Sequence, residues 1–427
     1  MKLHSASKLY GVPIIPGDKS ISHRALLLGS LARGKTEIYH LLEGEDVLST
    51  WRCLTQMGVS IAKVGERTLI RGQGPQNFLA SDEALDCGNS GTTMRLLLGI
   101  LSGLPHAMTL IGDSSLSARP MRRIAEPLRS MGARIELNRN EYAPVHIRGT
   151  PSLRAIHYSL PVASAQLKSA LLLAGLFAEG ETKLTGKIES RDHTERLLPF
   201  FGVSLESSPQ ELSIRGGQIL SGNEVKVPGD FSSAAFWIAA ATLIPDASIE
   251  IQNVSLNPTR TGLLSVLSRM GARIATEVTT SLPEPCGRLH VRSAPLQATT
   301  ILENEVPTLI DELPILAILA ARAEGQTRIH GVGELKVKET DRLQAIVCNL
   351  KAMGVVTESQ GNDLFITGPQ SFRGGRIESY GDHRIAMSFS IAALIAQGAT
   401  EVLGSECVRI SYPEFYSTLQ KLTQVRS

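Results

Sequence analysis

Polar side chains that could bind an anion recur in short motifs directly before long apolar stretches. The six motifs are GDKSISHR (17–24), CGNSGTTMR (87–95), VASAQLKS (162–169), PGDFSSAA (228–235), LIDELP (309–314) and YGDHRIA (380–386). Apolar residues at helical spacing predict that each motif opens a helix. A helix N-terminus offers unbonded backbone N–H groups and the positive end of the helix dipole, so these positions favour phosphate or carboxylate ligands.

The first motif supplies basic donors. GDKSISHR places Lys19, Ser20 and Arg24 on or just before a helix start. A capped surface helix is the plain alternative, since Asp or Ser before an apolar run is common. A phosphate loop for a triphosphate does not fit, because the glycine spacing is wrong and Asp18 would repel the ligand.

The next motifs add backbone and neutral donors. Asn89 and Gly91 are small enough for backbone N–H groups to approach an anion, although a tight strand-to-helix turn explains them equally well. Arg119 precedes a proline, which predicts an extended residue whose side chain lies outside a helix. Ser164 and Gln166 suit hydroxyl or phosphate oxygens, and Gln166 could equally be a satisfied core amide.

Acidic residues accompany basic ones in the second half of the chain. KVKETDRL groups Lys338, Glu339 and Arg342, and its plain interpretation is a solvated helix face with i,i+4 pairs. Asp311 could be an N-capping acid, and Arg384 stands at a helix start in YGDHRIA. The histidines show no HxxxH or HxH spacing, so we expect no metal. Together these groups predict a cleft that holds two anions and keeps a few acids to move protons.

A repeated unit of about seventy residues organises the whole chain. A Thr or Ser opens a β-rich stretch after each long apolar stretch, at Thr36, Thr109, Thr182, Ser248, Thr327 and Thr400. Two helices and several strands per unit predict an α/β or α+β class. Six units exceed one ordinary core, so we expect three units in each of two domains, joined by short crossovers near residues 13–17 and 222–229.

The first unit can be interpreted element by element. The predicted elements are a helix over 21–31, a strand over 36–39, a helix over 46–57, and strands at 59–61 and 68–71. Asp46 is expected to cap the second helix at its N-terminus, with Gly58 just past its C-terminus.

Composition excludes several classes of function. The 43 basic and 41 acidic residues leave a net charge of +2, and aromatic residues make up 4%, so we expect no nucleic-acid partner. The five cysteines are widely spaced and odd in number, which is typical of reduced thiols in a cytoplasmic protein. The N-terminus has no apolar signal core and no run approaches a membrane span, so we expect a soluble protein with no membrane partner.

Six motifs of the chain resemble those of the 5-enolpyruvylshikimate-3-phosphate (EPSP) synthases, also called 3-phosphoshikimate 1-carboxyvinyltransferases. In order along the chain they are GDKS-S-HR, GN-GT-MR, the ARP arginine, SAQ, KETDR and GDHR. The resemblance covers essentially the whole chain. It implies an inside-out α/β barrel of six βαβαββ repeats, three in a domain of residues 13–228 and three in a domain of residues 1–12 and 229–427. It also implies an active site in a cleft that closes on the substrates.

The resemblance further implies the reaction. The enolpyruvyl group of phosphoenolpyruvate passes to the 5-hydroxyl of shikimate 3-phosphate, and phosphate is released, in the pathway to aromatic amino acids. Guanidinium forks and one acid–base pair suffice for this chemistry, so no cofactor is expected.

The family pattern assigns roles to residues. Shikimate 3-phosphate would be bound by Lys19, Ser20, Arg24, Ser164, Gln166, Asp311 and Lys338. Phosphoenolpyruvate would be bound by Lys19, Asn89, Gly91, Arg119, Gln166, Arg342 and Arg384. Asp311 would be the base at the hydroxyl, Glu339 the proton partner at the enolpyruvyl carbon, and Lys19 a catalytic contact to both substrates.

The chain departs from the family pattern at two places. Ala165 replaces a second serine, and SRDHTE (190–195) resembles the more divergent bacterial branch, so Arg191 is expected to take over part of the phosphate binding. Ile410 stands where relatives have a lysine that binds phosphoenolpyruvate. If that segment is extended, the neighbouring Arg409 points to the opposite side and does not substitute.

Two alternatives stay open. The sister enzyme that transfers enolpyruvyl to UDP-N-acetylglucosamine usually carries a reactive cysteine before an Arg-Pro, whereas this loop reads SLSARP. A non-catalytic repeat scaffold would bind one phosphorylated ligand without releasing phosphate. We expect a monomer whose partners are its small-molecule substrates.

Overall fold

A computed structural model describes residues 1–425. Contacts between Cα atoms divide the chain into two compact units. The N-terminal unit comprises 17–227 together with the short segment 282–284, and the C-terminal unit comprises 1–16, 228–281 and the chain from 285 onwards.

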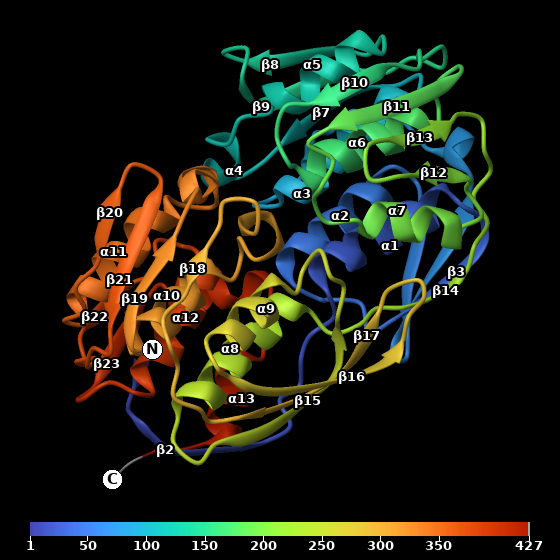
Figure 1. The fold of residues 1–427 in the computed structure, drawn as a ribbon. Coiled ribbons are helices and arrows are strands. Elements are labelled where there is room, and N and C mark those ends of the chain that lie inside the picture. Colours follow the sequence, from blue (N-terminus) through green and yellow to red (C-terminus); the bar gives the residue numbers. More distant parts are fainter. Residues whose placement is uncertain (426–427) are drawn as a thin grey trace. The chain divides into compact units, whose positions relative to one another are not determined.

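Three four-stranded sheets with the same strand order form the outer layer of the N-terminal unit (Figure 1). The first sheet has the spatial order β14 (Glu224–Lys226), β3 (Arg33–Tyr39), β5 (Arg67–Gln73) and β4 (Ser60–Val64). The second has the order β6 (Leu85–Asp86), β7 (Ala107–Ile111), β9 (Tyr142–Arg148) and β8 (Arg134–Asn138). The third has the order β10 (His157–Leu160), β11 (Glu181–Gly186), β13 (Leu212–Arg215) and β12 (Leu205–Ser207). In each sheet the first pair is parallel and the other two pairs are antiparallel. Buried and exposed residues alternate along the inner strands, as in β9, so each sheet turns one face to the core.

Three apolar helices fill the centre of this unit. They are α1 (Lys19–Leu31), α3 (Gly91–Ser102) and α6 (Ala165–Gly175), and each is buried on all sides over most of its length. A helix that is apolar all round needs cover on every side, which the three sheets provide. Gly99 allows α3 and α6 to touch, because a Cβ there would lie 2.3 Å from the carbonyl oxygen of Ala170. The remaining helices are α2 (Glu45–Gln56), α4 (Ser114–Ser117), α5 (Arg122–Ser130), α7 (His193–Phe200) and the 3₁₀ turn η1 (Pro75–Asn77).

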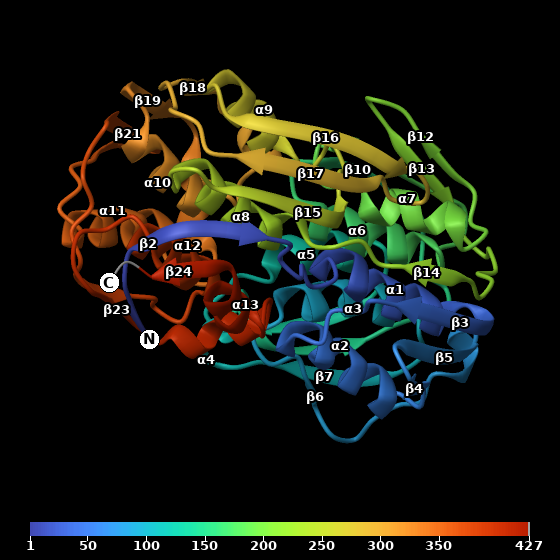
Figure 2. The same ribbon diagram turned by 90° about the horizontal axis from the view of Figure 1, so that it is seen from below.

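The C-terminal unit repeats the plan with three further sheets (Figure 2). Their strands, in spatial order, are β16 (Arg273–Thr280), β17 (Cys286–Arg292), β15 (Ser248–Ser255), β2 (Ala6–Gly11) and β24 (Thr423–Val425); β18 (Thr300–Ile301), β19 (Gly325–Ile329), β21 (Asp363–Gly368) and β20 (Glu358–Gln360); β1 (Lys2–Leu3), β23 (Thr400–Leu403) and β22 (Arg376–Glu378). Both β1 and β2 belong to the first residues of the chain yet complete sheets made by much later segments.

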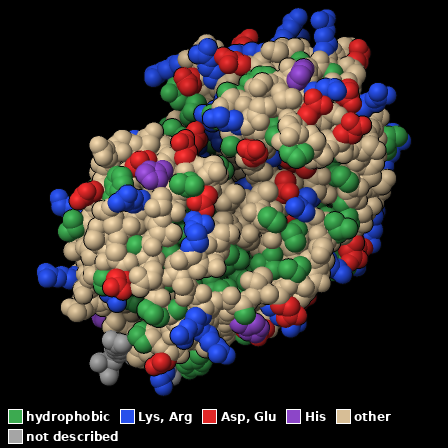
Figure 3. Space-filling view, viewed as in Figure 1, with side chains coloured by type: hydrophobic (Ala, Val, Ile, Leu, Met, Phe, Trp, Pro, Cys, Tyr) green, Lys and Arg blue, Asp and Glu red, His purple; other side chains and the backbone are tan. Residues whose placement is uncertain are grey.

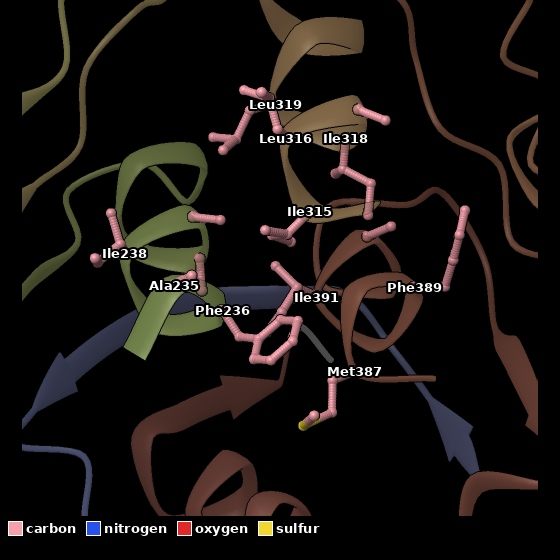
Figure 4. Packing of buried hydrophobic residues seen from close by; sticks show 14 of the residues in the cluster. Ala235, Phe236, Ile238, Ile315, Leu316, Ile318, Leu319, Met387, Phe389 and Ile391 are labelled. Carbon is pink, nitrogen blue, oxygen red and sulfur yellow. The ribbon is translucent and has the colours of Figure 1, made fainter. Parts of the chain in front are cut away.

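Apolar helices again occupy the centre. Helices α8 (Phe231–Leu243), α10 (Leu313–Arg322) and α12 (His383–Ala393) pack together, and Figure 4 shows Phe236, Ile315 and Ile391 in the space that they enclose. The remaining elements are α9 (Gly262–Arg269), α11 (Arg342–Ala352), α13 (Phe415–Leu422), η2 (Val306–Thr308), η3 (Val332–Val337) and η4 (Ser405–Ile410). Six sheets outside two sets of buried helices confirm the predicted inside-out α/β barrel of six repeats.

The element-by-element prediction for the first unit is largely confirmed. Helices α1 and α2 and strands β3, β4 and β5 occur where expected, and Gly58 adopts a φ of +86° just past α2. The prediction that Asp46 is the N-cap of α2 was wrong. Gly44 is the N-cap residue, and Asp46 lies in the first helical turn. Asp46 is used instead to pair with a lysine, which local capping rules do not anticipate.

Charge is mixed over the surface shown in Figure 3, where basic and acidic side chains are interspersed and no large field of one sign appears on the visible face. No helix among residues 1–425 is long and apolar enough to cross a membrane.

Candidate active-site clusters

In the N-terminal unit, the start of α1 presents Lys19 and Ser20. Asp18 caps this helix by accepting a hydrogen bond from the backbone N–H of Ile21 at 2.9 Å. The Lys19 ammonium forms an ion pair with the buried carboxylate of Asp46 from the first turn of α2. A cation at a helix N-terminus interacts unfavourably with the positive end of the helix dipole. The Asp46 carboxylate offsets this repulsion and stabilises the Lys19 ammonium at the start of α1.

Arg24 lies one turn further along α1 and is buried. Its Nε donates to Thr194 Oγ1 at 2.6 Å, one Nη to Ser169 Oγ at 2.7 Å and the other to the carbonyl oxygen of Ser20 at 2.9 Å. Burial lowers the pKa of Arg24 to about 10, although the nearby carboxylates of Glu195 and Asp18 oppose this shift. The guanidinium is therefore charged at neutral pH and braced by neutral oxygens.

The start of α3 gathers two guanidinium groups around Asn89 and Gly91. Arg119 lies in the bend after α4, outside a helix as expected, and donates to Asn89 Oδ1 at 2.7 Å and Ser115 Oγ at 3.1 Å. Its Nε is buried with no hydrogen-bond partner among the described residues. A Cβ at Gly91 would lie 2.9 Å from a guanidinium nitrogen of Arg95, so a larger residue here would displace the end of that side chain.

The start of α6 brings Ser164 and Gln166 to the same region of the unit. Ser164 caps α6 and accepts from the backbone N–H of Leu167 at 3.3 Å. Gln166 accepts from Arg95 at 2.7 Å through Oε1 and donates to Thr92 Oγ1 at 3.0 Å through Nε2. These bonds fix the amide orientation of Gln166 and tie the starts of α3 and α6 together.

In the C-terminal unit, Asp311 lies among three arginines just before α10. Its two carboxylate oxygens are 3.0 Å from Arg342, 3.4 Å from Arg384 and 3.6 Å from Arg260. The N-capping alternative for Asp311 was wrong, because the N-cap residue is Glu312 and no side chain caps this helix. The Asp311 carboxylate instead forms ion pairs with the three arginines around it.

The guanidinium nitrogens of Arg342 each donate a hydrogen bond to a carboxylate. They donate to Asp382 at 2.7 Å, Asp311 at 3.0 Å and Glu339 at 2.5 Å. Burial alone would lower the pKa of Arg342, but the charges of Asp382, Glu339 and Asp311 outweigh it and raise the pKa above its ordinary value. The plain alternative for KVKETDRL, a solvated helix face, does not hold at Arg342, since α11 begins at this residue and buries it.

Arg384 belongs to this cluster, and Lys338 lies next to Glu339 in the sequence. Arg384 stands in the first turn of α12, where Asp382 caps the helix and accepts from the Arg384 backbone N–H at 2.8 Å. Lys338 is the C-cap residue that follows η3, directly before Glu339. The structure thus brings Asp311, Glu339, Arg342 and Arg384 together.

The comparisons with known proteins bear on this whole arrangement. The family model described as EPSP synthase (3-phosphoshikimate 1-carboxyvinyltransferase) matches residues 3–419. The chain is 47% identical over 416 residues to a 3-phosphoshikimate 1-carboxyvinyltransferase of Bacillus cytotoxicus, covering 97% of this chain and 98% of the relative. This chain belongs to the EPSP synthase family.

Other EPSP synthase relatives agree. One from Synechococcus sp. is 49% identical over 428 residues and covers 99% of this chain and 96% of its own. A solved EPSP synthase from Acinetobacter baumannii superposes with a TM-score of 0.88 at 42% identity, covering 100% of this chain and 99% of that chain. The enolpyruvyl transferase NikO from Streptomyces tendae has a TM-score of 0.78 at 19% identity, covering 100% and 98%, and shares the fold. The predicted family and enzyme class are confirmed, and this EPSP synthase is an enolpyruvyl transferase.

Sequence reasoning missed several groups of these clusters. Arg95 was visible at the end of GNSGTTMR but was given no role. Arg260 donates to Ser232 Oγ at 2.7 Å, and Ser232 in turn hydrogen-bonds Glu312. Arg260 stands in no helix-start motif, so no local signal marked it.

The expectation that Arg409 does not replace the missing lysine depended on an extended segment, and that condition is not met. Arg409 and Ile410 end η4, a 3₁₀ helix, and so are not extended. With three residues per turn, consecutive side chains are about 120° apart rather than opposed. Arg409 is exposed and Ile410 is half-buried.

Proposed function

We propose that the two clusters divide the work of one reaction between anion binding and proton transfer. As an EPSP synthase, the chain transfers the enolpyruvyl group of phosphoenolpyruvate to the 5-hydroxyl of shikimate 3-phosphate. A C–O bond forms between the hydroxyl oxygen and C2 while C3 gains a proton. The C–O bond to phosphate then breaks as C3 loses a proton, which restores the enol ether and releases phosphate.

Shikimate 3-phosphate is bound, in this proposal, by groups at the starts of α1 and α6 and by residues of the C-terminal unit. The residues are Lys19, Ser20, Arg24, Ser164, Gln166, Arg191, Asp311 and Lys338. The bracing of Arg24 by Thr194 and Ser169 supports a role in which it holds a fixed positive charge. Neutral donors beside a fixed cation suit a phosphate group.

Phosphoenolpyruvate is bound by Lys19, Asn89, Gly91, Arg119, Gln166, Arg342 and Arg384. The buried Nε of Arg119, which has no partner among the described residues, supports its assignment as a donor to the ligand. Arg384 approaches Asp311 at 3.4 Å, a contact that an incoming carboxylate or phosphate can replace.

Asp311 is the proposed base, Glu339 the proton partner at C3, and Lys19 the cation that touches both substrates. The observation that carries this assignment is the Arg342 guanidinium, which hydrogen-bonds Asp311 and Glu339 at once. One rigid group therefore orients the acid and the base, whose proton transfers must occur on the same substrate pair.

A coupled assay of phosphate release tests the proposal. Release should require both shikimate 3-phosphate and phosphoenolpyruvate and should be unaffected by EDTA. Release with UDP-N-acetylglucosamine in place of shikimate 3-phosphate would transfer the assignment to the sister enzyme, although the SLSARP loop of this chain has no cysteine. Binding of one anion without any release would favour the scaffold.

We further propose that the enzyme works as a monomer in the cytoplasm. Sedimentation at working concentration tests the first point, and cell fractionation tests the second.

A further inference from the structure

Lys168 is a buried lysine of α6 that the proposed reaction does not use. It lies one helical turn after Ser164, and its side chain is 2% exposed. A lysine ammonium has three N–H donors and loses much hydration energy when it is buried, so all three need acceptors.

All three acceptors come from one short stretch of chain. The Lys168 ammonium donates to the carbonyl oxygen of Ile188 at 2.9 Å and to that of Ser190 at 3.2 Å, and it pairs with Glu195 Oε1 at 2.6 Å. The two carbonyls belong to the irregular segment between β11 and α7, and Glu195 stands in the first turn of α7. A single ammonium thus holds both ends of the segment that contains Arg191.

The Ser190 carbonyl makes this contact specific, because it belongs to the peptide unit that joins Ser190 to Arg191. A peptide unit is planar and rigid, so a bond to its oxygen fixes the orientation of the following N–Cα bond. Lys168 therefore restrains the backbone from which the Arg191 side chain projects.

A second contact joins the same two elements. Ser169 Oγ lies 2.7 Å from Thr194 Oγ1, and both hydroxyls bind the Arg24 guanidinium. The pKa of Arg24 is lowered first by burial and to a smaller extent by the positive charge of Arg191, so the two guanidinium groups lie near each other. Two neighbouring guanidinium groups repel each other, so the backbone restraint on Arg191 affects how closely it approaches Arg24.

We propose that Lys168 is a positioning residue for shikimate 3-phosphate, which acts by holding Arg191 against the helix that presents Ser164. The inference rests on the proposed function, in which Arg191 and Ser164 bind the phosphate. Lys168 itself is covered by protein and touches no substrate in this account.

Calorimetric titration with shikimate 3-phosphate alone measures the proposed effect without turnover. Lys168→Met keeps the length of the side chain and removes the three donors. Its Kd should rise roughly tenfold, the loss expected for charge-assisted bonds that orient a ligand group. In steady state, kcat and the KM for phosphoenolpyruvate should stay within about twofold at saturating shikimate 3-phosphate, because the other ligands are untouched.

A matched control and a double-mutant cycle separate positioning from general damage. Lys183→Met removes an exposed lysine of β11 that pairs with Glu181 and Glu211, and it should leave the Kd unchanged. Arg191→Ala should itself raise the Kd. If Lys168 acts through Arg191, adding Lys168→Met to Arg191→Ala should change the Kd by less than about twofold.

The cycle has outcomes that overturn the inference. An undiminished effect of Lys168→Met in the Arg191→Ala background would show that Lys168 does not act through Arg191. An unchanged Kd in Arg191→Ala would remove Arg191 from the phosphate site, and the inference with it. A wild-type protein that binds shikimate 3-phosphate but releases no phosphate would reject the reaction, while the binding cycle would still judge Lys168.

A second variant covers the case in which Lys168→Met fails to fold because it leaves Glu195 buried without its cation. Lys168→Met/Glu195→Gln removes both charges and tests the same restraint. The same rise in Kd, lost again in the Arg191→Ala background, is expected. A folded double variant with wild-type Kd would refute the proposal.

Discussion

Buried arginines of the two units have different hydrogen-bond acceptors. In the N-terminal unit, Arg24 and Arg119 donate to hydroxyl, amide and carbonyl oxygens. In the C-terminal unit, Arg342 donates to three carboxylates. The first two guanidinium groups therefore have neutral acceptors, whereas the third holds three acidic side chains in place.

The helix starts beside these arginines share part of their geometry. Helices α1, α3, α6, α8 and α12 each have a side chain that caps the first turn, and α10 has none. The difference lies in the neighbouring elements, which supply Thr194, Ser169 and Asn89 in one unit and Asp311, Asp382 in the other. The side chains of the neighbouring elements therefore distinguish the two clusters.

The largest expected effect concerns stability. Arg342→Met should lower the free energy of unfolding by about 3–5 kcal/mol, because it leaves buried carboxylates without their cation. Arg119→Met removes bonds to neutral groups and should cost about 1–2 kcal/mol. Urea unfolding measures both, with Trp51 reporting on the N-terminal unit and Trp237 on the C-terminal unit after the other tryptophan is replaced by Phe. Equal losses would erase the contrast between the two kinds of surroundings.

The next effect concerns the base. Asp311→Asn keeps the shape of the carboxyl group but cannot accept a proton, so turnover should fall by about a hundredfold or more. Binding of shikimate 3-phosphate, measured by calorimetry, should survive. Lost binding together with wild-type turnover at saturation would make Asp311 a ligand and not the base.

Arginine geometry gives the third effect. Replacing Arg119 or Arg384 by Lys keeps the charge but removes the planar guanidinium. The resulting fall in kcat/KM should correspond to a loss of about 2 kcal/mol or more of transition-state stabilisation. Initial rates at varied phosphoenolpyruvate measure the loss. Near-wild-type values in Arg384→Lys would remove that residue from the site.

The smallest effect concerns η4. Ile410→Lys should strengthen the apparent binding of phosphoenolpyruvate by roughly 1 kcal/mol, which lowers its KM. The variant adds a partly solvated cation where relatives are expected to carry one. Arg409→Ala is the control and should change the KM little, since Arg409 is exposed. A large rise in Arg409→Ala with no gain in Ile410→Lys would identify Arg409 as the missing ligand.

The sequence predicted the repeats and the helix starts because both are local patterns. Apolar spacing and capping residues mark Lys19, Asn89 and Ser164 as helix-start residues, and the structure places them there. The failures share a different cause. Asp46 and Arg342 look like ordinary surface positions until the fold brings Lys19 to the first and Asp311 to the second. Tertiary pairing of charges leaves no periodic trace, so it could not be predicted from spacing.

The sheets of the C-terminal unit set the order in which the chain can finish folding. Strand β2 is synthesised long before its partners β15 and β24, which begin at Ser248 and Thr423. Strand β1 likewise waits for β23 at Thr400–Leu403. Residues 17–227, by contrast, supply every strand of the sheets in their own unit. The N-terminal unit can therefore complete its sheets once residue 227 has been synthesised, whereas β1 and β2 of the C-terminal unit stay without their strand partners until much later segments follow.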